Sequence, residues 1–306
     1  MPITRRTFLA TATMAAAHAA ARPPGFLIDT HIHLFAKDQT RFPYHPDAPY
    51  QPPAADLADY KTFLAESKID HVVIVHPEPY QDDHRYLEYC FANEPTPGLF
   101  KGTCLFDPIA PETPGRMEEI VARNPGRIVA MRIHEMRGRG APPAKTGAIK
   151  DRDLADPRMK DTWRKARQLN IAIQMHFTPW FAPGIGRLAN EFDDVPVILD
   201  HIGRAGMGTP ADYAEVLKLA KLPRTYLKFS GWRYSSKQGQ PFRDAKPIVQ
   251  KAYDAFGPDR IVWGGLGHNS EEFSAAIEVF ELMFDYASDQ EKANIRGLIA
   301  SKLFHI

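Results

Sequence analysis

Short apolar runs rich in valine and isoleucine recur along the chain, and each is followed by a stretch that reads as a helix. The first run is GFLIDTHIHLF at 25–35, and the eighth is RIVWGGLGHN at 260–269. Between them lie HVVIVHPEP, KGTCLFDP, IVAMRIHEM, IAIQMHF, VPVILDHIG and TYLKFSGW. Strands that alternate with helices indicate parallel βαβ units, and eight units in about 280 residues predict an α/β fold, a (β/α)8 TIM barrel.

The pattern also sets the expected helices and the extent of the domain. Two irregular stretches, 41–60 and 137–156, would lie at the C-terminal face of the barrel, where active sites are built. No Ser/Gly linker or low-complexity run divides the chain, so 23–306 is expected to form a single domain. Helices are expected near 56–68, 83–95, 115–124, 157–169, 184–193, 210–220, 243–255, 270–284 and 288–303.

Several histidines stand at or near the carboxyl ends of the predicted strands. Side chains alternate across a strand, so one set faces the barrel axis and the other faces the helices. This alternation directs Gln174 and His176 inward in the fifth strand, and Arg132 and His134 inward in the fourth. The histidines at the strand ends are His31, His33, His76, His134, His176, His201 and His268.

The first strand carries two of these histidines in a His-x-His pattern. Alternation predicts that His31 and His33 face inward together with Leu27 and Asp29, while Ile28 faces the helices. Neutral imidazoles that meet at one mouth can bind a zinc-like ion, and they can also donate hydrogen bonds to a substrate carbonyl. A third histidine on a distant strand favours a functional site over isolated structural histidines.

Composition and charge narrow the class of ligand. The chain has 306 residues, of which 44% are hydrophobic, with 38 basic and 37 acidic side chains. This balance, without a basic block interleaved with aromatics, argues against a nucleic-acid partner and favours a small-molecule substrate. The two cysteines, Cys90 and Cys104, are too few for a disulfide framework, so we expect them to be buried as small apolar side chains.

The first 22 residues have the pattern of an export signal. Arg5 and Arg6 precede Phe8, Leu9 and an alanine-rich run, which is typical of the twin-arginine route. We therefore expect a periplasmic or extracytoplasmic protein. No later apolar run is long enough to span a bilayer, so no membrane association is expected once the signal is removed.

Five motifs carry a resemblance to a known family. In order along the chain they are DTHIHLF, QMHF, ILDHIG, KFSG and IVWGG, and the likeness runs from about residue 26 to 304. Together they resemble the amidohydrolase superfamily, and within it the amidohydrolase-related branch. That branch contains lactonases and decarboxylases such as 2-pyrone-4,6-dicarboxylate lactonase, fuconolactonase and aminocarboxymuconate semialdehyde decarboxylase.

The resemblance implies roles for the strand-end histidines. His31, His33 and His176 match metal ligands of the family, and His201 matches its sixth-strand histidine. The expected cofactor is one divalent, zinc-like metal, with a metal-free site as the alternative. The fourth-strand lysine that bridges two metals in other branches has no counterpart in IVAMRIHEM, so a binuclear site is not expected.

The eighth strand departs from the family pattern. Where the family reads Trp-Gly-x-Asp, this chain has Leu266, which neither binds metal nor accepts a proton. Alternation would point this leucine at the histidines. The candidate general bases are His268, Glu78, Glu135 and Asp200, and His201 is a further catalytic candidate.

Substrate contacts can also be assigned from the sequence. Arginine suits a planar carboxylate because of its bidentate fork, and aromatic residues after strands can line a ring-binding wall. The candidate substrate-binding residues are Arg132, Trp232, Arg233 and Asn269.

Asp29 and Lys228 are expected to pair, either with each other or with groups of the inner site, because an unpaired buried charge is costly.

Three functions follow, in order of preference. The first is hydrolysis of a small organic acid ester or lactone, a reaction in which the general base has to contribute only modestly to the rate. The second is decarboxylation of a small carboxylated substrate, which needs no water activation. The third is a non-catalytic barrel that binds a ligand.

Overall fold

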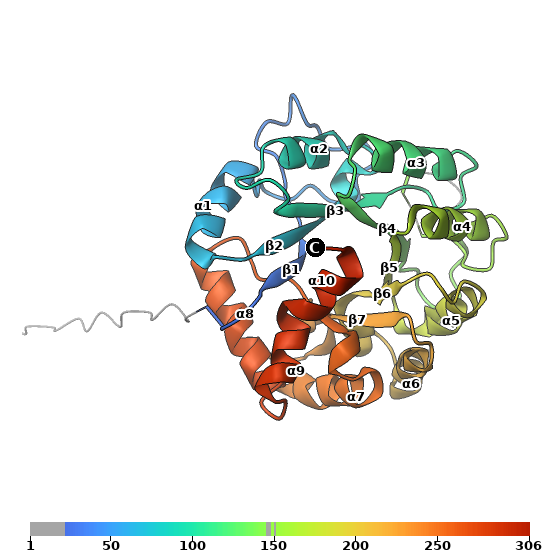
Figure 1. Cartoon of the computed structure of the whole chain (residues 1–306). Helices are drawn as coiled ribbons and strands as arrows, with labels where there is room; N and C mark the ends of the chain where they lie inside the picture. Colours follow the sequence, from blue (N-terminus) through green and yellow to red (C-terminus); the bar gives the residue numbers. More distant parts are fainter. Residues whose placement is uncertain (1–21, 145–147, 150) are drawn as a thin grey trace, which may run out of the picture.

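The computed structural model describes residues 22–144, 148–149 and 151–306. The predicted export signal lies outside the described residues, apart from Arg22. Eight parallel strands follow one another in chain order around a single sheet. The first and eighth strands also lie against each other, linked by a hydrogen bond from Thr30 Oγ1 to the Trp263 carbonyl at 2.8 Å. The sheet is thus a nearly closed barrel, and the predicted (β/α)8 fold is confirmed (Figure 1).

The strands occur where the apolar runs predicted them. Their cores are rich in Val and Ile, which pack well on a pleated sheet buried on both faces. They are β1 (Ile28–Ile32), β2 (His71–Val75), β3 (Phe100–Leu105), β4 (Ile128–Glu135), β5 (Ala172–Phe177), β6 (Val197–Leu199), β7 (Thr225–Phe229) and β8 (Ile261–Trp263).

An outer ring of helices surrounds the barrel (Figure 1). Among the described residues, no helix combines the length and the apolarity that crossing a bilayer requires. The predicted helix at 288–303 is broken in the structure, because a π-helical turn over Asn294–Leu298 separates its two ends. The helices are α1 (Leu57–Ser67), α2 (Arg85–Ala92), α3 (Thr113–Arg123), α4 (Met159–Leu169), α5 (Ala182–Glu191), α6 (Pro210–Lys218), α7 (Lys246–Phe256), α8 (Ser270–Met283), α9 (Asp289–Ala293) and α10 (Ile299–Phe304).

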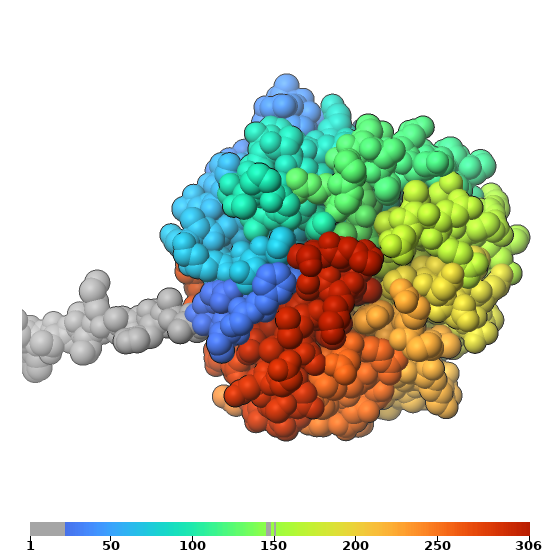
Figure 2. All heavy atoms as spheres, in the orientation of Figure 1, coloured from blue at the N-terminus to red at the C-terminus, as the bar shows by residue number. Residues whose placement is uncertain are grey.

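Two apolar clusters stabilise the barrel. The larger lies mainly between the sheet and the outer helices, and both Cys90 and Cys104 are buried there as free thiols. The smaller fills the barrel interior near its N-terminal end, where α10 packs Ile299, Ala300 and Phe304 against inward residues of the strands. Burying a phenylalanine such as Phe304 contributes about 1.5–3 kcal/mol. In Figure 2 the C-terminal segment covers the centre of this end of the barrel.

In β1, the directions of the first side chains differ from the predicted alternation. Its register against β2 shifts between Asp29 and Ile32, where β1 has one residue more than its partner. A bulge of this kind reverses which side chains face which way. Ile28 therefore belongs to the interior cluster and Leu27 to the outer one, the opposite of the prediction. His31, which lies within this irregular segment, still reaches the barrel axis, where it approaches Asp200.

Candidate active site

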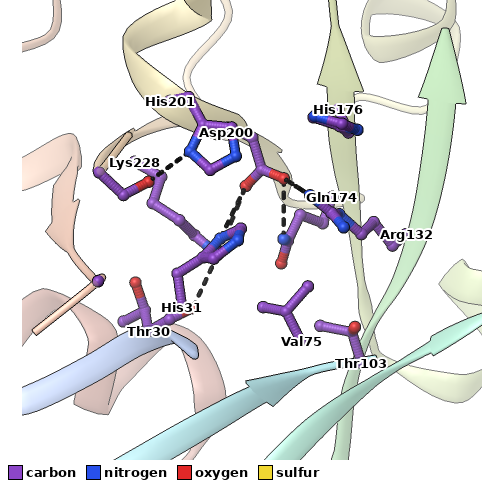
Figure 3. Close-up of polar contacts among 12 residues, drawn as sticks. Thr30, His31, Val75, Thr103, Arg132, Gln174, His176, Asp200, His201 and Lys228 are labelled. Atoms are coloured by element: carbon purple, nitrogen blue, oxygen red, sulfur yellow. Dashed lines mark hydrogen bonds and ion pairs between the residues drawn. The ribbon is translucent and has the colours of Figure 1, made fainter. Parts of the chain in front are cut away.

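Asp200, which directly follows β6, anchors the floor of the site. Its carboxylate is fully buried and accepts hydrogen bonds from Arg132 Nη2 and Gln174 Nε2, both at 3.1 Å. Lys228 Nζ lies 3.5 Å away and His31 Nδ1 lies 3.7 Å away (Figure 3). Burial alone would raise the pKa of Asp200, but the two neighbouring cations hold it well below its usual range. The carboxylate is therefore ionised and neutralises part of a buried positive charge.

Lys228 is fully buried beside this carboxylate. It also donates a hydrogen bond to the Thr30 carbonyl at 2.8 Å, and burial lowers its pKa to about 8. The sequence left open whether Lys228 pairs with Asp29 or with the inner site, and the structure shows the second arrangement. Asp29 instead accepts the backbone N–H groups of His31, Gly265 and Leu266 at 2.8–2.9 Å.

Four histidines form a cluster above this floor. His31 and His33 bring their Nε2 atoms to 3.3 Å of each other. The ring of His201 lies 4.7 Å from that of His31 and 5.6 Å from that of His176, measured between centroids. Burial lowers the pKa of His31 to about 4 and those of the other three well below 6.5. At neutral pH all four are uncharged and keep a nitrogen lone pair.

A left-handed turn after β6 shapes one wall of the cluster. Residues 201–204 all have φ between 51° and 64°. For residues other than glycine this conformation costs about 1–2 kcal/mol each, and the buried side chain of Ile202 helps to hold the turn in place. The turn lets both His201 and Arg204 approach His176, whose Nε2 is in contact with the Arg204 guanidinium. Arg204 was not foreseen, because no sequence signal announces a left-handed run through His, Ile and Arg.

The seventh strand fixes the orientation of His201. Its Nδ1 lies 3.0 Å from Ser230 Oγ, directly after β7. A Cβ atom on Gly231, which has φ +53°, would lie 2.5 Å from the same nitrogen. A glycine is therefore required for the backbone to approach the imidazole this closely.

A second polar group lies beside the cluster. His134, at the end of β4, places Nδ1 3.2 Å from Glu78 Oε1 and 3.3 Å from His176 Nδ1. Glu78 belongs to a short 3-10 turn, η1 (Glu78–Tyr80), that follows β2. The ends of β2, β4 and β5 thus bring a carboxylate into contact with the histidines.

Other residues selected from the sequence are held in structural contacts. Glu135 is fully buried and receives two hydrogen bonds from Arg137, both at 2.7 Å. It faces away from the axis because it alternates with inward His134. Asn269 caps α8 by accepting the Glu272 N–H at 2.9 Å.

The eighth-strand residues also lie differently from the prediction. His268 Nε2 donates to the His33 carbonyl at 2.8 Å, and its Nδ1 lies 3.4 Å from Glu272, so both ring nitrogens are engaged. Leu266 is fully buried in the larger apolar cluster, which differs from the predicted placement toward the histidines. The left-handed Gly265, at φ +82°, redirects the chain just before this leucine.

The rim carries the remaining predicted substrate contacts. Arg233 donates to Tyr234 Oη at 3.1 Å, and the Arg204 guanidinium lies 3.9 Å from the centre of the Tyr234 ring. Burial raises the pKa of Tyr234, but Arg233 and Arg204 lower it by a larger amount, so the net shift is downward. Trp232 packs on Phe229, with 5.3 Å between ring centroids.

A divalent cation has a set of suitable donors here. One donor atom each from His31, Asp200 and His201 lie within 4.8 Å of one another, and all three residues are buried. Within the described part of the chain, His31 Nδ1 and Asp200 Oδ1 are buried without a hydrogen-bond partner. Imidazole and carboxylate donors suit zinc, so these residues fit such an ion. The set shares His31 with the predicted ligands, while His33 and His176 stand beside it.

Comparisons with known proteins agree with this architecture. The sequence profile of the family described as Amidohydrolase matches residues 28–305. The 4-sulfomuconolactone hydrolase of Hydrogenophaga intermedia is 25% identical over 289 residues, covering 88% of this chain and 85% of the relative. The L-fucono-1,5-lactonase of Burkholderia ambifaria is 24% identical over 245 residues, covering 78% and 79%.

Solved structures show the same fold. A probable 2-pyrone-4,6-dicarboxylic acid hydrolase from Acinetobacter baumannii has a TM-score of 0.72 and 22% identity, covering 92% of this chain and 99% of its own. A zinc-bound amidohydrolase from Burkholderia multivorans has a TM-score of 0.68 and 17% identity, with coverage of 92% and 100%. At these identities the likeness establishes the architecture alone.

Proposed function

Because the chain belongs to the amidohydrolase family, we propose that it hydrolyses a small lactone or a related ester of an organic acid. The observation that carries the proposal is the cluster of neutral, buried imidazoles above Asp200 at the carboxyl ends of the strands. Both curated relatives are named for the hydrolysis of lactones, over most of the length of this chain. A lactonase-like hydrolase is the enzyme class that fits both observations.

The chain's own residues would orient and polarise the substrate. Neutral imidazoles can donate hydrogen bonds to a lactone carbonyl oxygen and keep their charge unchanged while doing so. Arg132 and Lys228 compensate Asp200, which keeps that carboxylate in a fixed position beneath the cluster. His31, Asp200 and His201 would hold a zinc-like ion, which supplies Lewis-acid polarisation of the carbonyl when bound.

An acidic substituent on the substrate is supported by the cations at the mouth. Arg132 was the first candidate for this role, but its guanidinium already bonds to Asp200. Arg204 and Arg233, which share contacts with Tyr234, are better placed to receive a carboxylate or sulfonate. The preferred substrates are therefore small anionic lactones.

Leu266 stands where the family carries an aspartate, so the role of that carboxylate is absent at this position. Its burial among apolar side chains supports this interpretation. Export by the twin-arginine route is a further part of the proposal, supported by Arg5 and Arg6.

The test is acid release from three lactones: 4-sulfomuconolactone, L-fucono-1,5-lactone and 2-pyrone-4,6-dicarboxylate. We expect the purified protein to open at least one ring, with one proton released per turnover and no carbon dioxide. Release of carbon dioxide would instead establish a decarboxylase. Saturable binding of all three without turnover would establish a non-catalytic barrel.

A further inference from the structure

We propose that Glu78 is the general base and acid of the reaction, and that His134 positions it. The inference rests on the proposed lactone hydrolysis, in which the carboxylate missing at position 266 must be supplied from elsewhere. Glu78 lies in the turn that follows β2. In the sheet, β2 borders β1 on one side, and β8 borders β1 on the other.

Three carboxylates that stand in or directly after strands are already held by other groups. Asp200 is fully buried between two cations. Glu135 is fully buried and bonded twice to Arg137. Asp29 receives three backbone N–H groups. All three residues are 0% exposed, so none of these carboxylates has open access to water from the solvent.

Glu78 combines a fixed position with access to water. Its side chain is 25% exposed, whereas that of His134 is 2% exposed. The 3.2 Å contact with His134 Nδ1 engages Oε1. Burial raises the pKa of Glu78, but the contact with His134 and the positive charges of Arg132 and Arg204 lower it by a larger amount. Glu78 is therefore ionised at neutral pH.

His134 connects this carboxylate to the histidine cluster. Both contacts are made by one ring nitrogen: His134 Nδ1 lies 3.2 Å from Glu78 Oε1 and 3.3 Å from His176 Nδ1, so the three side chains are held next to one another. His134 thus acts as a positioning residue that keeps the carboxylate beside the cluster.

The chemical step balances with Glu78 as the carrier of one proton. Glu78 takes a proton from water while the water oxygen bonds to the lactone carbonyl carbon, and the carbonyl π electrons move to its oxygen. When this intermediate collapses, the bond from that carbon to the ring oxygen breaks, and the leaving oxygen takes the proton from Glu78. The product is the open-chain hydroxy acid, which releases its carboxyl proton to solvent.

The experiment compares Glu78→Gln and Glu78→Ala with wild type on the three lactones named above. General base removal lowers a rate by about 10²- to 10⁴-fold, so we expect kcat of Glu78→Gln to fall by that factor while KM changes less than about threefold. Added formate should restore part of the kcat of Glu78→Ala, because the small carboxylate can occupy the space left by the side chain. A purely structural role would not respond to formate.

The matched control is Glu118→Gln, since the Glu118 side chain is 63% exposed and pairs with Lys165 on the outer helices. It should retain wild-type kcat. Circular dichroism melts of each variant exclude loss of fold. A Glu78→Gln variant with kcat within threefold of wild type, or a folded Glu78→Ala variant without formate rescue, would overturn the inference while leaving lactone hydrolysis intact. A wild type that opens none of the three rings would overturn the proposed function and the base role together.

Discussion

Replacement of Asp200 by asparagine tests the buried charges beneath the histidines. Asp200→Asn keeps the shape of the side chain but removes the negative charge that Arg132 and Lys228 share. The Arg132 side chain is 4% exposed, and those of Asp200 and Lys228 are 0% exposed. Removing one partner of a buried ion pair costs about 3–5 kcal/mol, because the remaining charge is left without compensation. We expect a loss of that size in the free energy of unfolding.

Lys228→Met gives the contrasting case. It leaves Asp200 paired with Arg132, so the remaining charges balance, and the expected cost is less than half that of Asp200→Asn. In the double variant Asp200→Asn/Lys228→Met only one buried cation remains of the original three charges. The double variant should therefore be more stable than the sum of the single losses predicts, by about 0.5–3 kcal/mol.

The assay is equilibrium unfolding in urea at pH 7, followed by tryptophan fluorescence. Asp194→Asn is the control, because Asp194 is 57% exposed and its ion pair with Arg167 lies at the surface. Its effect should stay within about 0.5 kcal/mol. A loss below about 1 kcal/mol for Asp200→Asn, or strict additivity in the double variant, would refute the account of a coupled buried network.

Three further predictions concern the site and the export signal. Stability should fall as the pH drops from 6.5 to 4, because the unfolded chain protonates its histidines in a range where folded His31, with its pKa lowered to about 4, stays neutral; His31 alone contributes about 3 kcal/mol, and a constant urea midpoint between pH 7 and pH 4 would contradict this. Gly231→Ala should lower kcat by about 10²-fold, because the added Cβ would lie 2.5 Å from His201 Nδ1 and displace the ring; an unchanged steady-state rate would show that this imidazole is not needed in its observed position. Replacing Arg5 and Arg6 with lysine should leave the precursor in the cytoplasm, as measured by fractionation, and a normal amount of mature protein outside would disprove the twin-arginine route.

Much of the barrel could be predicted because its strands have clear apolar patterns. In β5, Ile173, Met175 and Phe177 face the helices as expected, which leaves Gln174 and His176 inward. The same reasoning failed at the start of β1, because alternation assumes a regular strand and the bulge after Asp29 adds a residue that no local pattern reveals.

The site was harder to predict where backbone conformation decides direction. Arg204 reaches His176 through four consecutive left-handed residues, a conformation that sequence propensities disfavour. Asn269 has the composition of a polar contact residue, yet its oxygen caps a helix, which is the commonest use of asparagine at such a position. Glu78 could be named only as one of several carboxylates, because its contact with His134 joins segments 56 residues apart in sequence.

The packing of α10 against one end of the barrel affects how substrate and product would enter and leave the site. The interior cluster and the C-terminal helix fill the N-terminal end of the barrel, so small molecules would reach the candidate site from the opposite, C-terminal face. In the proposed hydrolysis, the lactone, the water and the opened acid would all use that face. A hydroxy-acid product bound by Arg204 and Arg233 would occupy the place of the next lactone. The product should therefore be a competitive inhibitor and slow turnover as it accumulates.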